Sequence, residues 1–256
     1  MSKKNGKNGN GENGNGADKK PVVAKPKQEC VNKRQALTQL RRLKWDVEFR
    51  NDNQQKFFQT IESNDVTFCS GPAGCGKTYL AVYYALQALG TKGSPYNGII
   101  IVKPLVEADG EKLGFLPGDI EEKTEPFMWS YYYNIEQVVG KTKMNILLAE
   151  SVIQIMPLAY MRGITLSEKI VILDESQNTT PEQVKMFLTR IGDQSKYIIC
   201  GDLDQTDRKI TNGLEDAMRR FTHLDGVGFT TFSKEDIVRH EIVGRLLDRY
   251  QTQHYN

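Results

Sequence analysis

Residues 66–78 hold the pattern with the clearest chemical meaning in this chain. A short apolar run leads into Gly71-Pro-Ala-Gly-Cys-Gly76, and Lys77 and Thr78 follow directly. This spacing fits G-x-x-x-x-G-K-S/T, in which glycines let successive backbone N–H groups converge on one phosphate at the positive end of a helix. Lys77 would contact the β- and γ-phosphates of ATP, and Thr78 would hold Mg²⁺. We therefore expect the nucleotide to be bound by Gly71, Pro72, Ala73, Gly74, Cys75, Gly76, Lys77, Thr78 and Tyr79.

The elements on either side of this loop have the order that the motif requires. Val66–Ser70 is a short, largely apolar run typical of a buried strand. After the loop, apolar residues recur at helical spacing until Gly90, a residue type that often ends helices. The residues at this spacing are Leu80, Ala81, Tyr84, Ala85 and Leu89. The sequence thus predicts a strand, a phosphate-binding loop and a helix in succession.

Two adjacent carboxylates provide the acidic partner that such a loop needs. Lys169–Leu173 is a second run typical of a buried strand, and Asp174 and Glu175 follow it. Asp174 would hold the magnesium shell through water, because Mg²⁺ keeps much of its hydration. Glu175 would orient and polarise a water molecule for attack on the γ-phosphate, which favours hydrolysis over a kinase reaction. The plainer alternative is that Asp174 and Glu175 are simply two solvated carboxylates at the end of a strand.

Four further residues are candidates for the chemistry, and three of them have a plainer alternative. Gln54 precedes the loop and could pair with adenine through its amide, or lie exposed on a helix. Gln205 follows the strand expected at 197–200, where it could sense the γ-phosphate and link nucleotide state to movement. Arg239 could stabilise transition-state charge or form a surface salt bridge. Lys103 ends a buried apolar run and could meet nucleic-acid phosphate or solvent.

Periodicity and turn residues predict the rest of an α/β core. The further strands are expected at 98–102, 151–156, 197–200 and 228–232. Helices are expected from Val31 to Val47, from Asn53 to Ile61, through Trp129–Tyr133 with a break near Pro126, from a Thr180 cap to Gly192, and from Asp236 to Tyr250. The aromatic cluster at Trp129–Tyr133 could stack bases. Packing against the core or a neighbouring subunit is the commoner use of such residues.

Length and composition limit the organisation of the chain. With 256 residues and 39% hydrophobic content it can bury one sizeable core. Residues 1–28 are rich in Asn, Gly and Lys, too polar to offset the entropy of ordering, so we expect a disordered tail before one domain at 29–256. The net charge is +2, but residues 1–29 hold seven lysines against three acidic residues. The remainder is near neutral, so nucleic acid would have to bind through a local patch.

Signals for targeting and for metal-binding cysteines are missing from the sequence. No apolar run reaches the length of a membrane span, and the Met1 end carries no apolar signal segment, so we expect a cytoplasmic protein without membrane contact. The four cysteines form no C-x-x-C pair and the three histidines are scattered, which supports neither a zinc site nor a disulfide framework. Cys75 could make activity sensitive to oxidation, or could simply be a small residue that fits the turn.

Taken in order, these motifs resemble the PhoH family of P-loop ATPases. The resemblance covers roughly residues 50–250 and involves many motifs in sequence order. They are Gly71–Ala81, Val106-Glu-Ala, Lys112–Gly118, Ala159–Gly163, Leu173–Asn178, Thr179–Gly192, Gly201–Gln205 and Asp236–His240.

The resemblance implies both a fold and a function. The family is similar to the ATPase half of superfamily 1 helicases, which implies a three-layer α/β P-loop core with a mainly parallel, RecA-like sheet. It implies ATP hydrolysis with Mg²⁺ coupled to RNA, as a helicase or remodeller; a nucleotide-dependent switch that acts on a protein partner is the alternative. Some members look like hexameric rings, so we expect a homo-oligomer in which Arg239 or Arg162 reaches a neighbouring site. Members are common in phages, which suggests a phage-encoded protein in the host cytoplasm.

Overall fold

The computed structural model describes residues 32–105, 120–205 and 212–238, with side chains of the helix at 120–139 described from Met128 onward. The predicted tail, Arg239 and most of the helix predicted from Asp236 lie outside these residues. The motifs Val106-Glu-Ala and Lys112–Gly118 also lie outside them.

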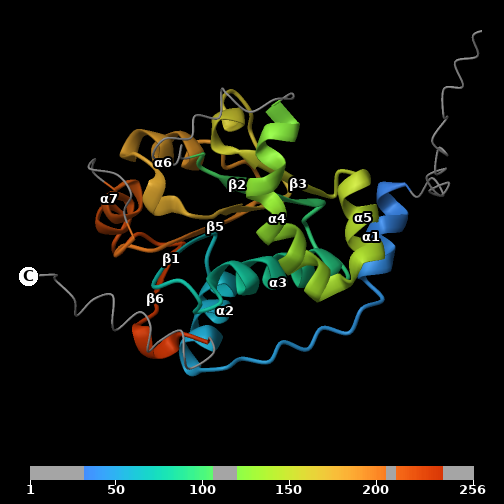
Figure 1. Ribbon diagram of the computed structural model, residues 1–256, viewed down its shortest axis with the longest axis horizontal. Helices are drawn as coiled ribbons and strands as arrows, with labels where there is room; N and C mark the ends of the chain where they lie inside the picture. Colours follow the sequence, from blue (N-terminus) through green and yellow to red (C-terminus); the bar gives the residue numbers. More distant parts are fainter. Residues whose placement is uncertain (1–31, 106–119, 206–211, 239–256) are drawn as a thin grey trace, which may run out of the picture. The chain divides into compact units, whose positions relative to one another are not determined.

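Six strands form one sheet in the order β3-β2-β4-β5-β1-β6 (Figure 1), and all neighbouring pairs are parallel. The strands are β1 (Val66–Ser70), β2 (Gly98–Lys103), β3 (Ile153–Pro157), β4 (Lys169–Leu173), β5 (Lys196–Gly201) and β6 (Val227–Thr231). Each predicted strand is confirmed to within two residues at either end. Because β5 lies between β1 and β4, one strand end separates the phosphate-binding loop from the acidic pair.

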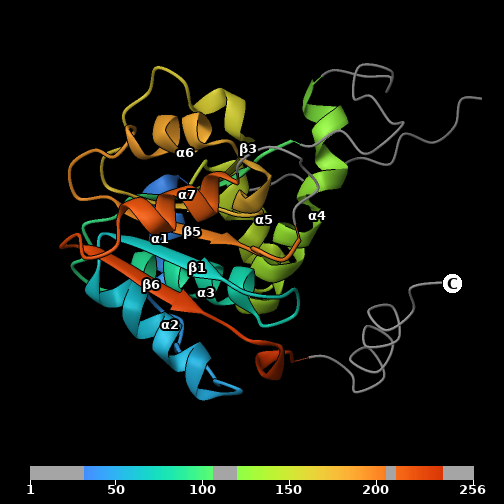
Figure 2. The same cartoon turned by 90° about the vertical axis from the view of Figure 1, so that its left-hand side faces the viewer.

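Helices cover both faces of this sheet (Figure 2), which confirms the predicted three-layer α/β fold with a parallel sheet. One face packs against α1 (Lys33–Leu40), α2 (Asp52–Ser63), α3 (Lys77–Gly90), α4 (Ile120–Val139) and α5 (Lys141–Ala149). The other packs against η2 (Leu158–Met161), α6 (Pro181–Leu188) and α7 (Gly213–Arg220). Within β4, Ile170 and Ile172 face the first group whereas Val171 and Leu173 face the second. This is the alternation of side chains along a strand that is buried on both faces.

The first helix is shorter than the sequence predicts. It ends at Leu40, and the chain then turns and runs without regular structure to Phe49. Leu43, Trp45 and Val47 still pack against the core, and the Trp45 ring lies edge-on to Tyr83 with centroids 5.9 Å apart. The predicted extension to Val47 is therefore wrong, because core contacts hold this segment along α3 instead of in a helix.

The fourth and fifth helices also differ from expectation. α4 continues through Pro126, so the predicted break there is wrong. Its buried residues Tyr131, Ile135 and Val139 anchor the helix in the core beyond the proline. The short helix α5 follows Gly140 and was not predicted. No helix among the described residues is long and apolar enough to cross a membrane.

The helix that follows the acidic pair begins as predicted but ends early. Thr180 and Gln183 form the expected capping box, each side chain bonded to the backbone N–H of the other. The helix ends at Leu188, not at Gly192, because the Gly192 N–H donates to the Leu166 carbonyl at 3.0 Å. Ile191, an apolar residue within the predicted helix, consequently lies outside α6 and is 39% exposed.

Candidate nucleotide-binding site

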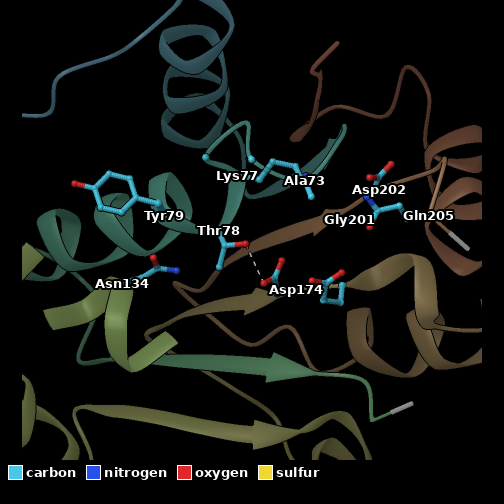
Figure 3. Close-up of a pocket in the computed structure, with 12 residues that line it drawn as sticks. Ala73, Lys77, Thr78, Tyr79, Asn134, Asp174, Gly201, Asp202 and Gln205 are labelled. Atoms are coloured by element: carbon cyan, nitrogen blue, oxygen red, sulfur yellow. Dashed lines mark hydrogen bonds between the residues drawn. The ribbon is translucent and has the colours of Figure 1, made fainter. Parts of the chain in front are cut away.

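The carboxyl ends of β1, β4 and β5 open onto a cavity of about 330 Å³. Figure 3 shows Tyr79 and Asn134 at one side of it, Thr78 and Asp174 in the middle, and Gln205 at the other side. Ligands of open parallel sheets bind at this edge. The lining residues are Ala73, Gly74, Gly76, Lys77, Thr78, Tyr79, Asn134, Asp174, Glu175, Gly201, Asp202 and Gln205.

Two glycines give the phosphate-binding loop its shape. Gly76 caps the start of α3 with φ 86°, a left-handed backbone conformation that residues with a side chain rarely adopt. Gly71 passes so close to the end of β6 that an added Cβ would lie 2.5 Å from the Cβ of Phe232. The loop thus turns into the helix at Gly76 and is backed by the end of β6 at Gly71. Backbone N–H groups at the start of a helix are a common binding site for anions.

The side chain of Lys77 folds back over the phosphate-binding loop. Its side chain is largely buried, and Nζ donates to the carbonyl oxygens of Gly71 at 2.6 Å and Pro72 at 2.9 Å. These carbonyls hold the ammonium beside the loop. Phosphate oxygens carry full charge and form stronger bonds with an ammonium than neutral carbonyls do. Lys77 is therefore placed to exchange these partners for an anion in the cavity.

Thr78 and Asp174 bring the loop and the acidic strand into direct contact. Thr78 Oγ1 donates to Asp174 Oδ2 at 2.9 Å. Burial raises the pKa of the Asp174 carboxyl and the charge of Glu175 raises it further, while the bond from Thr78 opposes both effects. In the described parts of the chain no Lys or Arg forms an ion pair with Asp174. Among the described residues, Asp174 is therefore a buried carboxyl group that no ion pair neutralises, although Lys77 lines the same cavity.

This oxygen pair fits a magnesium ion. Mg²⁺ prefers oxygen ligands and in nucleotide sites is held by one or two protein groups together with phosphates and water. The described residues contain no group of three or more His, Cys, Asp or Glu side chains arranged for a metal. A magnesium ion bound together with a nucleotide does not need such a group. Thr78 and Asp174 are the residues that would hold the ion.

Glu175 follows Asp174 in a conformation that is rare for its residue type. Its backbone lies in the left-handed region at φ 54° and ψ 36°, which costs about 1–3 kcal/mol for a residue other than glycine. Gln177, in the short helix η3 (Ser176–Asn178), donates from Nε2 to Glu175 Oε2 at 2.7 Å. Sequence reasoning missed Gln177, although it lies only two residues after the predicted catalytic carboxylate.

Gln54 bonds to the loop itself in this structure. Its Nε2 donates to the Cys75 carbonyl at 2.9 Å, and its Oε1 accepts from the Arg50 N–H at 2.8 Å. The side chain is 4% exposed. One amide hydrogen and one lone pair remain after these two bonds, so the adenine contact stays a prediction. The observed bonds show a different role, which is to support the loop from behind.

The end of β5 contributes two polar residues to the cavity. Gln205 is exposed and lines the cavity where it was predicted. Asp202 is buried, its Oδ1 accepts from the Asp204 N–H at 3.0 Å, and its Oδ2 has no partner among the described residues. Arg162 is exposed and does not line the cavity, and Arg239 lies outside the described residues.

The aromatic cluster of α4 divides between core and surface. Tyr131 is fully buried, with the Lys103 ammonium 5.9 Å from its ring centre. Trp129 and Tyr133 are 66% and 63% exposed and lie one helical turn apart. Asn134 of the same helix lines the cavity, and no sequence signal identified it. Packing against the core therefore describes Tyr131, and base stacking stays a prediction for Trp129 and Tyr133.

Comparison with known proteins places the chain in a family. The family model described as "PhoH-like protein" matches residues 46–251. The PhoH-like protein of Bacillus subtilis is 43% identical over 209 residues, which are 81% of this chain and 65% of that protein. Protein PhoH of Escherichia coli K12 is 42% identical over 205 residues, 78% of this chain and 57% of that protein. The chain thus spans less than two-thirds of either relative.

Among solved structures, the crystal structure of Pif1 helicase from Candida albicans aligns with a TM-score of 0.42 and 15% identity, over 80% of this chain and 44% of that one. The sequence matches are far stronger and cover most of the chain. The 46–251 range of the family model includes the loop, the acidic pair and the end of β5. The chain belongs to the PhoH-like protein family.

Proposed function

We propose that the chain binds ATP together with Mg²⁺ and hydrolyses it. The observation that carries this proposal is the contact of Thr78 with Asp174 in a cavity that Lys77 and Glu175 also line. Phosphoryl transfer depends mainly on positioning and on electrostatic stabilisation of charge. One cavity here contains an ammonium, a hydroxyl–carboxylate pair and a second carboxylate, which are the groups that such a reaction needs.

Each side chain has a separate task in this mechanism. The N–H groups of the loop bind the phosphate oxygens, and Lys77 leaves the Gly71 and Pro72 carbonyls to contact the terminal phosphates. Mg²⁺ held by Thr78 and Asp174 would supply positive charge to the same oxygens. Glu175 accepts a hydrogen bond from the attacking water and thereby directs the lone pair of the water oxygen at the γ-phosphate. Gln205, at the far side of the cavity, contacts the phosphate that is released.

We propose further that hydrolysis is coupled to RNA. The exposed rings of Trp129 and Tyr133 lie on α4, the helix that also places Asn134 in the cavity. Aromatic side chains on a surface stack on bases of single strands without regard to sequence. A helix that touches both the nucleotide and the bases would connect the two binding events.

A homo-oligomer, in the form of a hexameric ring, is also part of this proposal. None of the described residues that line the cavity is an arginine, although an arginine speeds phosphoryl transfer in many enzymes. A second copy of the chain would supply that residue. The two candidates are Arg162, which is exposed, and Arg239, which lies outside the described residues.

The test of the proposed function is ATP turnover with and without RNA. Lys77→Ala and Glu175→Gln should each lower kcat by about 100-fold or more, because each removes a group that acts on the transition state. Glu175→Gln should retain binding of a fluorescent ATP analogue, which shows that the site is folded. Normal turnover by both variants would disprove the site assignment. Turnover that RNA leaves unchanged would instead favour a switch that acts on a protein partner.

A further inference from the structure

A buried side chain joins Glu175 to the end of a different strand. Gln177 Nε2 donates to Glu175 Oε2 at 2.7 Å, and Gln177 Oε1 accepts from the Asp202 N–H at 3.0 Å. Gln177 is 2% exposed, so solvent does not compete freely for either bond. The amide therefore connects the carboxylate after β4 to the backbone after β5.

These two partners fix the direction of the amide. A backbone N–H can only donate, and an ionised carboxylate can only accept. Reversing the amide would place two donors together at Asp202 and two acceptors together at Glu175. The NH₂ end is thus held on the carboxylate, and a hydrogen bond to a charged group is among the stronger kinds.

A second bond joins the same two elements without touching the carboxylate. Ser176 Oγ donates to the Cys200 carbonyl at 2.7 Å, which ties η3 to β5 directly. The connection between these elements consequently does not depend on the bond from Gln177 to Glu175. What that bond adds is the orientation of the Glu175 side chain, whose backbone is already held in the left-handed region.

We propose that Gln177 is a positioning residue for hydrolysis: anchored on the Asp202 N–H, it holds the Glu175 carboxylate in the orientation that directs it at the attacking water. The proposal rests on the function proposed above. It assigns to Gln177 an effect on the rate of the chemical step, and none on nucleotide binding.

Two substitutions in the full-length chain separate orientation from anchoring. Gln177→Glu keeps an oxygen that can accept from the Asp202 N–H but replaces the donor to Glu175 with a like charge. Ser176→Ala is the matched control, because it removes the neighbouring bond to β5 and leaves the Glu175 carboxylate and its donor in place. Gln177→Met, of similar length and without charge, removes both bonds and serves if the buried charge of the first variant impairs folding.

We expect Gln177→Glu and Gln177→Met to lower kcat by about 10–100-fold, by analogy with the loss of hydrogen-bond partners that orient metal ligands. The dissociation constant of a fluorescent ATP analogue should stay within about threefold, because Gln177 does not line the cavity. Ser176→Ala should keep kcat within about threefold, even where thermal denaturation shows a lower melting temperature. Measuring kcat, binding and melting for all three variants completes the comparison.

A double-mutant cycle provides the decisive result. In a Glu175→Gln background, Gln177→Met should leave the residual single-turnover rate unchanged, because no carboxylate remains to be held. A further loss in that background, or wild-type kcat in both single variants of Gln177, would overturn the proposal. Failure of the proposed function gives a different result: Glu175→Gln alone would then turn over normally, and this inference would fall with it.

Discussion

Cys75 lies within the phosphate-binding loop but is chemically protected. Burial raises the pKa of its thiol to about 11, and this effect outweighs the opposing charge of Lys77. Its Sγ also contacts the Ser233 carbonyl at 3.7 Å. Because the thiolate is the reactive form, the geometry favours the plainer interpretation of this residue, a small side chain that fits the turn.

This protection predicts slow alkylation of the native protein. A pKa two units above the value of 9.0 for a free thiol leaves about 100-fold less thiolate at pH 7.5, so Cys75 should react with iodoacetamide at least that much more slowly than in denaturant. The rate should rise with pH until about pH 11, where the thiol loses its proton. Peptide mass spectrometry over a time course measures it, and equal rates in native and denatured protein would contradict the assignment.

At the scale of elements, the sequence predicts strands better than helix ends. β1 and β4 coincide with their predictions because a run buried on both faces leaves a continuous apolar signal. α1 and α6 end early because contacts with distant segments, at Trp45 and at Leu166, decide where the chain leaves the helix. A single sequence carries no signal for such contacts.

The same limit applies to the candidate site. The loop and the acidic pair were predictable because their residues are consecutive and follow apolar strands. The role of Gln177 depends on the position of Asp202 after a different strand. Asn134 lines the cavity only because that face of α4 is turned toward it in the fold. The sequence identifies Gln54 as a candidate residue. Its bond to the Cys75 carbonyl exists only in the folded loop, so the sequence does not predict it.

The exposed face of α4 supports a prediction about RNA. Replacing Trp129 and Tyr133 together with Ala should weaken binding of single-stranded RNA by about 30-fold or more, since stacking contributes about 1–3 kcal/mol per base and the variant removes two rings. ATP turnover without RNA should stay within about twofold, because neither residue lines the cavity. Fluorescence anisotropy with labelled RNA measures the effect.

Leu224→Ala provides the control for this experiment. Leu224 is 54% exposed and lies between α7 and β6, and α7 packs on the face of the sheet opposite to α4, so its replacement should leave RNA binding unchanged. If the double variant binds RNA as tightly as the unaltered protein, the aromatic face of α4 has no part in RNA coupling.

At the scale of the whole molecule, the proposed oligomer predicts complementation between inactive variants. Arg162→Ala and Glu175→Gln should each abolish most turnover, and mixed assemblies should recover part of it. A Glu175→Gln subunit can still donate Arg162 to a neighbour that retains Glu175. Light scattering before and after mixing gives the mass of the assembly. A monomer with full turnover, or no recovery in assemblies that have exchanged subunits, would exclude Arg162 from this role.

The contact between Gly71 and Phe232 has a consequence for how the protein is made. β6 lies beside β1, with Thr231 opposite Ser70, although these strands are far apart in the chain. The Val238 N–H also donates to the Gly74 carbonyl at 3.0 Å. During translation the early loop therefore lacks its backing until residues 227–238 have left the ribosome. A nascent chain that ends before β6 carries the complete phosphate-binding motif without this backing, so under the function proposed above we expect it to bind ATP only after residues 227–238 have emerged.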